Sequence, residues 1–102
     1  MASPLVRFRI DFAAHAEVAS GKIQLHEAIR RSGSLSQAAR DLGMSYRRAW
    51  MLIASLNASF NKPVTRASAG GRGGGAAALT RFGAQLIASY RLLDKEISAL
   101  AA

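Results

Sequence analysis

The residue types best suited to specific recognition lie just after Gly43, at Tyr46, Arg47, Arg48 and Met51. The planar guanidinium group of arginine can donate two hydrogen bonds to O6 and N7 of guanine, and a good pair contributes about 1 to 3 kcal/mol of discrimination. Tyr46 can donate to a phosphate or lie against a thymine methyl group, and Met51 projects from the same part of the chain. We therefore interpret Tyr46, Arg47, Arg48 and Met51 as base-reading residues, with the two arginines as the main ones.

The charge of the chain points to the same kind of partner. There are 14 lysines and arginines against 6 acidic residues, and between residues 40 and 81 Asp41 is the only acid. Such a basic field favours a polyanion. The residues that we expect to contact the DNA backbone are Ser36, Gln37, Arg40, Ser45, Lys62, Arg66 and Arg81.

Residues 34–60 carry the pattern of a helix-turn-helix. Ser34 followed by Gln37 is a capping-box pair that begins one helix, Gly43 ends it, and Ser45 can cap the next helix two residues later. The second helix has one apolar stripe, at Ala49, Leu52, Ile53, Leu56 and Phe60. When this stripe faces the core, the base-reading residues project from the other side. Trp50 is expected to pack at the edge of the core.

Two further elements precede this unit. Val6, Phe8, Ile10 and Phe12 alternate with polar residues, which predicts a strand over residues 5–12. Residues 13–20 show no clear period and are expected to form a connection. Apolar residues at helical spacing predict a helix over 21–32, ended by Gly33.

A hairpin, or wing, is expected over residues 63–79, with short strands at 64–68 and 76–79. Its glycine-rich tip carries Gly71, Arg72 and Gly73, and an arginine on such a slender ribbon suits the minor groove or the backbone. Thr80 can cap a final helix over 80–100. A heptad seam on this helix predicts a dimer interface made by Leu86, Tyr90, Leu93, Ile97 and Leu100.

The residues give no sign of catalysis. Paired carboxylates, a nucleophile beside a base and a metal cluster are all missing from the sequence pattern, so we expect no catalytic residue, no metal site and no cofactor. His15 and His26 have no partner at ligand spacing and are expected at the surface. Cysteine is absent, and no signal peptide or apolar run of membrane-spanning length is visible, so the expected location is the cytoplasm, with no membrane partner.

The expected fold class is mainly α with a small β-sheet: a single winged helix-turn-helix domain over residues 1–102, with a long C-terminal dimerisation helix. The expected function is a sequence-specific transcriptional regulator that binds an inverted repeat in double-stranded DNA as a homodimer. Two alternatives stay open. The first is an architectural, sequence-tolerant DNA-binding protein. The second is an interaction module that works with a separate sensor protein.

Three segments also resemble a known family. Gly33 to Trp50 (GSLSQAARDLGMSYRRAW), the glycines of residues 70–75 and Leu79-Thr-Arg-Phe-Gly83 are similar to the N-terminal domain of the molybdate-responsive ModE family of bacterial regulators, which itself resembles the winged helix of LysR-type regulators. The resemblance implies a symmetric dimer joined largely through the terminal helices, with the helix that begins at Tyr46 in the major groove. Family members with a sensor carry molybdate-binding modules after this domain. Because these 102 residues end before such modules, we expect a stand-alone chain without them.

Overall fold

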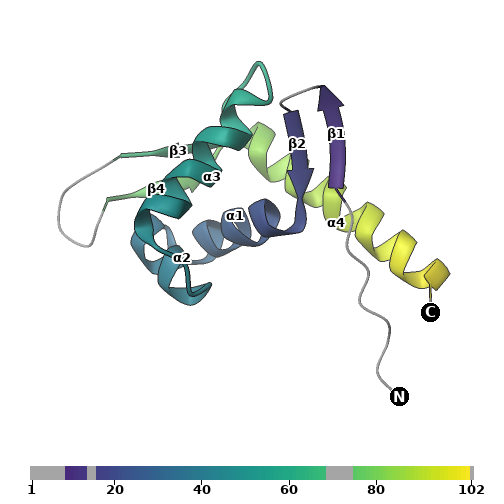
Figure 1. Cartoon of the computed structure of the whole chain (residues 1–102), viewed down its shortest axis with the longest axis horizontal. Coiled ribbons are helices and arrows are strands. Elements are labelled where there is room, and N and C mark those ends of the chain that lie inside the picture. Colours follow the sequence, from purple (N-terminus) through teal and green to yellow (C-terminus); the bar gives the residue numbers. More distant parts are fainter. Residues whose placement is uncertain (1–8, 14–15, 69–74, 102) are drawn as a thin grey trace.

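The computed structural model describes residues 9–13, 16–68 and 75–101, and it is mainly helical with two small antiparallel sheets (Figure 1). In chain order the elements are β1 (Arg9–Ala13), β2 (Ala16–Ala19), α1 (Ser20–Ser32), α2 (Leu35–Asp41), α3 (Tyr46–Ala58), β3 (Thr65–Ala67), β4 (Ala77–Leu79) and α4 (Arg81–Ala101). This order confirms the expected fold class, a winged helix-turn-helix followed by a long C-terminal helix. No helix in the described ranges has the length and apolar character needed to cross a bilayer.

The first sheet is a hairpin of β1 and β2, in which Arg9 pairs with Ala19 and Ile10 with Val18. The strand expected over residues 5–12 is found from Arg9, and its residues 5–8 lie outside the described part of the chain. The expectation of a simple connection over residues 13–20 is wrong, because β2 occupies half of it. The strand is only four residues long (AEVA) and Val18 is its only large apolar residue, so the sequence carries too short a pattern to mark it.

The core has two clusters of buried side chains that share α1. Leu25 and Ile29 of α1 pack with Leu35 of α2 and Ile53 of α3, which holds the helix-turn-helix together. The second cluster brings together β2, α1, α3, the residue before β3 and α4. Its buried residues are Val18, Ile23, Leu56, Val64, Ile87 and Tyr90. Each large aliphatic side chain buried in this way contributes about 1.5 to 3 kcal/mol. Helix α1 therefore ties α2 and α3 to the β1–β2 hairpin and to α4.

Glycine allows the turn that brings the wing back to the helices. Gly33 takes a left-handed conformation (φ 69°), and its N–H donates to Ile29 O at 2.8 Å, which ends α1 where the sequence predicts. The Gly33 carbonyl accepts from the N–H of Ala77 at 3.1 Å, and Ser34 forms an isolated bridge with Ala76. Strand β4 is thereby attached to the start of α2.

Helix α4 begins at Arg81 and is capped by Thr80, as expected, and it runs away from the rest of the molecule at its C-terminal end (Figure 1). The Thr80 hydroxyl accepts from the N–H of Gly83 at 2.9 Å and donates to Pro63 O at 2.6 Å. Gly83 is required here because a Cβ at this position would lie 2.0 Å from Val64 O. The first turn of α4 is thus pressed against the chain that enters β3.

His26 corrects an expectation, because it is fully buried in α1 instead of at the surface. Its Nδ1 donates a hydrogen bond to the carbonyl oxygen of Lys22 at 2.6 Å. Burial lowers the pKa of His26, and the nearby charge of Lys22 lowers it further. The hydrogen bond to the Lys22 carbonyl acts in the opposite direction. His15 lies outside the described residues.

Candidate nucleic-acid interface

The turn between α2 and α3 is built from short-range signals that the sequence carries. The Ser34 hydroxyl accepts from the N–H of Gln37 at 3.2 Å, and the Ser45 hydroxyl accepts from the N–H of Arg48 at 3.1 Å. Between them Gly43 has a φ of 67°. Both predicted N-caps and the predicted turn are confirmed.

The first two turns of α3 present the residues expected to read bases. Arg47 and Arg48 are exposed, and the Met51 side chain is 62% exposed. On the opposite side Ala49 and Ile53 are buried. In the part of the chain that the structure describes, no carboxylate pairs with either arginine. Both guanidinium groups are therefore available to an external anion or base.

Tyr46 and Trp50 form an aromatic pair at one side of this surface. Their ring centroids are 6.2 Å apart and the rings are nearly perpendicular. Tyr46 is 38% exposed, whereas Trp50 is partly buried against the first core cluster, as expected. The pair fixes the direction of the Tyr46 ring, since aromatic contacts of this kind favour one geometry.

Exposed polar side chains of helix α2 are hydrogen-bonded to one another. The Gln37 amide donates to Asp41 at 2.7 Å, and its oxygen accepts from Arg40 at 2.9 Å. A full capping box would also have the Gln37 side chain accept from the N–H of Ser34. That part of the prediction is wrong, because the N–H of Ser34 donates to the Ser32 hydroxyl instead. Arg40 keeps its charge because its partner is a neutral amide, while Ser36 is only partly exposed.

Asn57 joins α3 to the wing, a role that the sequence patterns do not indicate. Its Oδ1 accepts from the N–H of Val64 at 2.8 Å and of Thr65 at 3.2 Å, and its Nδ2 donates to Thr65 O at 3.0 Å. An asparagine near the end of a helix looks like a capping residue or a turn residue, and only the tertiary fold brings β3 beside it. Helix α3 is thus hydrogen-bonded directly to the first strand of the wing.

The wing strands agree with the expected hairpin, with Thr65 paired with Leu79 and Ala67 with Ala77. The tip residues Gly71, Arg72 and Gly73 lie outside the described residues. Their expected contact with DNA stays a prediction.

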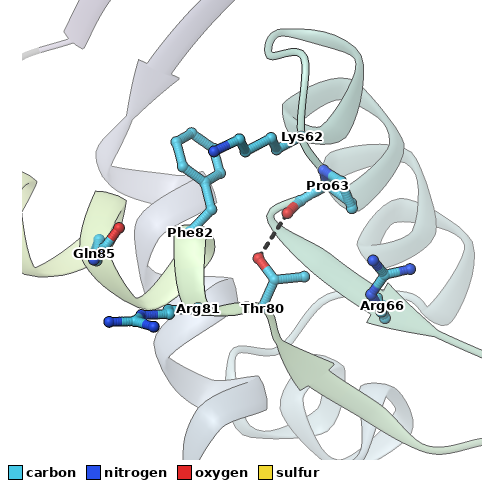
Figure 2. Close-up of a pocket in the computed structure, with 7 residues that line it drawn as sticks. All are labelled: Lys62, Pro63, Arg66, Thr80, Arg81, Phe82 and Gln85. Carbon is cyan, nitrogen blue, oxygen red and sulfur yellow. Dashed lines mark hydrogen bonds between the residues drawn. The ribbon is translucent and has the colours of Figure 1, made fainter.

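At the base of the wing the structure brings together three of the expected backbone-contacting residues. Lys62, Arg66 and Arg81 line one open pocket of about 420 Å³. Figure 2 shows that they come from the segment before β3, from β3 itself and from the start of α4. We call this the wing-base pocket; its other lining residues are Pro63, Thr80, Phe82 and Gln85. Gln85 has no counterpart among the sequence expectations, because a single polar residue on an amphipathic helix carries no signal.

The terminal helix departs from the expected seam at Tyr90. This side chain is only 3% exposed and packs with Leu86 and Ile87 in the chain's own second core cluster. The prediction of Tyr90 as a dimer contact is therefore wrong for its ring, because the heptad face overlaps the face that packs on α1. Farther along the helix, Leu100 is 88% exposed.

An ion pair fixes the direction in which α4 leaves the domain. Arg91 donates from Nε to Glu27 of α1 at 2.8 Å, with a second bond from its terminal nitrogen, and it also pairs with Asp94 at 3.1 Å. The hydrogen bond from Arg91 lowers the pKa of Glu27, although partial burial opposes the shift. Planar, two-point contacts of this kind hold an angle better than a single charge contact.

A helix-turn-helix with an exposed basic second helix, followed by a β-hairpin, defines a winged helix-turn-helix domain of the kind found in nucleic-acid-binding proteins. Residues 21–84 match the family described as bacterial regulatory helix-turn-helix protein, lysR family. The chain therefore belongs to this family.

Curated relatives support the resemblance to ModE. The chain is 43% identical over 82 residues to the molybdenum-pterin-binding protein MopA of Rhodobacter capsulatus, a match that covers 80% of this chain and 31% of that protein. It is 37% identical over 92 residues to the molybdenum transport protein ModE of Azotobacter vinelandii (90% and 34%). It is 44% identical over 72 residues to the DNA-binding transcriptional dual regulator ModE of Escherichia coli K12 (71% and 28%). The chain thus spans about a third of the length of these relatives.

Proposed function

We propose that this chain is a sequence-specific DNA-binding transcriptional regulator that acts as a homodimer. The observation that carries the proposal is the exposure of Arg47 and Arg48 on the first turn of α3, directly after the Ser45 cap. The helix-turn-helix family and the regulatory names of similar proteins favour the same reading. Exposed arginines without carboxylate partners in the described ranges suit a polyanion.

In this proposal α3 lies in the major groove. Arg47 and Arg48 hydrogen-bond to guanine edges, and Met51, one helical turn after Arg47, lies against a thymine methyl group. The wing follows the minor groove or the backbone, with Arg72 at its tip. Because Asn57 fixes α3 to β3, groove and wing contacts are made in one register.

The dimer is proposed to form through the outer half of α4. Leu93 and Ile97 are partly exposed and Leu100 is almost fully exposed, so this stretch of the seam has apolar surface to bury. Two copies related by a twofold axis place their α3 helices in successive major grooves, roughly 34 to 36 Å apart, on an inverted repeat.

The test is a binding-site selection with the purified chain, followed by competition of the selected duplex against a random duplex at fixed salt. We expect an inverted repeat and at least about a thousandfold preference for it. Equal competition by the random duplex would indicate the architectural, sequence-tolerant alternative. Loss of DNA retention together with co-purification of a second polypeptide would indicate a module for a separate sensor protein.

A further inference from the structure

The wing-base pocket concentrates positive charge beyond what a solvated surface requires. Lys62, Arg66 and Arg81 line it from three separate segments, yet no acidic residue lines it. Within the described ranges none of these three side chains has an ion pair. The three positive charges around this opening repel one another. An anion bound between them would be attracted to all three, which offsets that repulsion.

Two of the lining residues, Thr80 and Phe82, are held in place by contacts within the chain. The Thr80 hydroxyl is occupied by Pro63 O and by the N–H of Gly83, so it braces the pocket and does not offer a strong donor to a ligand (Figure 2). The Phe82 ring is fixed by an edge contact with Phe60, at 5.4 Å between centroids. Phe82 thus gives the pocket a fixed wall, and the three exposed cationic side chains supply the charge that an anion needs.

We propose that the wing-base pocket binds one phosphate group, held by Lys62, Arg66 and Arg81 with the Gln85 amide as an additional donor. Guanidinium and ammonium groups together match the charge and the several oxygens of a phosphate. The volume of about 420 Å³ lies within the range of small-ligand sites. The phosphate belongs either to a DNA backbone or to free orthophosphate; only the first source rests on the proposed function.

The first arm of the test uses orthophosphate alone. The ¹⁵N-labelled chain is titrated with sodium phosphate while sodium chloride keeps the ionic strength constant, and backbone amide shifts are followed by NMR. We expect saturable shifts at Arg81, Phe82 and Gln85. Lys62→Gln and Arg81→Gln should each weaken the response by at least about threefold, as expected for loss of one partly screened ion contact.

The matched control is Lys95→Gln, which removes one exposed lysine farther along α4 and outside the pocket. It should leave the orthophosphate response unchanged. Equal weakening in Lys95→Gln and Arg81→Gln would show a general charge effect and overturn the site. Unchanged dispersion of the amide spectra shows that each variant is folded.

The second arm repeats the titration with a selected duplex bound. If a DNA phosphate fills the pocket, the duplex shifts the same three amides and orthophosphate no longer does. If the pocket serves free phosphate, the orthophosphate response persists in the complex. The proposal is overturned when neither orthophosphate nor the duplex produces a response that depends on Lys62 and Arg81. A chain that binds no duplex contradicts the proposed function and leaves the first arm to decide the pocket.

Discussion

Asn57 and Thr65 are hydrogen-bonded in both directions: Nδ2 of Asn57 donates to Thr65 O at 3.0 Å, and Oδ1 accepts from the N–H of Thr65 at 3.2 Å. The same oxygen accepts from Val64. One side chain therefore satisfies three backbone groups where α3 meets the wing. This contact attaches α3 directly to the start of β3.

Replacing Asn57 with alanine removes these three bonds and leaves part-buried backbone groups unpaired. We expect the free energy of unfolding to fall by about 2 to 3 kcal/mol, since each bond contributes about 1 kcal/mol. Urea denaturation followed by circular dichroism measures this. Asn61→Ala, at an exposed position just after α3, is the control and should change stability by less than about 0.5 kcal/mol. Equal losses in the two variants would contradict the bracing role of Asn57.

His26 predicts a pH dependence of stability. Burial lowers the pKa of His26 below its usual value of 6.5, so the unfolded chain binds a proton more readily than the folded one. Stability should therefore fall as the pH drops below about 6.5, by up to about 1.4 kcal/mol for each pH unit, until the lowered folded pKa is reached.

The measurement is a series of urea denaturations between pH 7.5 and about 5, compared with His26→Leu, which removes the titrating ring. Leucine removes only the bond from Nδ1 to the Lys22 carbonyl, because Nε2 of His26 has no partner among the described atoms. The difference between the two proteins cancels any contribution of His15. Parallel stability curves for the two proteins would refute this prediction.

Met51 predicts sensitivity to a single methyl group in the DNA. It is 62% exposed and lies one turn after Arg47, on the face of α3 that the proposed function places against DNA. Replacing the contacted thymine with deoxyuracil, one position at a time, should weaken binding about fourfold at one position per half-site, as expected for one buried methyl. Met51→Ala should abolish that difference and Met51→Leu should keep most of it. A uracil effect of the same size in Met51→Ala would assign the methyl contact to another residue.

A carboxylate introduced into the outer half of α4 should weaken the proposed dimer. Leu93→Asp and Ile97→Asp place a carboxylate in the proposed seam, and we expect both to shift a dimer towards monomer in sedimentation velocity. Leu92→Asp is a matched control, because Leu92 is 60% exposed but lies outside the seam. Dissociation by Leu92→Asp alone would place the interface on a different face of the helix.

The parts of the fold that the sequence predicts best are those with local causes. Ser34 and Ser45 cap helices through amides three residues away, and Gly33 and Gly43 end helices in conformations that glycine favours. These contacts need no knowledge of the rest of the chain. Helix α1, the turn and the exposed face of α3 follow from them.

The parts that escape prediction depend on which distant element covers a face. The heptad pattern of α4 shows that one face is apolar, but not that Tyr90 is buried by its own domain. His26 carries a signal that is easily overlooked: it lies three residues before Ile29 and so within the apolar stripe of α1. Strand β2 is defined by its pairing with β1, and its four residues are too few to show that pairing in the sequence.

The central claim is that the arginine pair at the start of α3 reads bases, and site selection with Arg47→Ala and Arg48→Ala tests it most directly. Each variant should lose preference at one base position per half-site, by about 1 to 3 kcal/mol of discrimination, while the other positions keep theirs. Lys95→Ala should leave every position unchanged. Base preferences identical to those of the parent chain in both arginine variants would contradict the account.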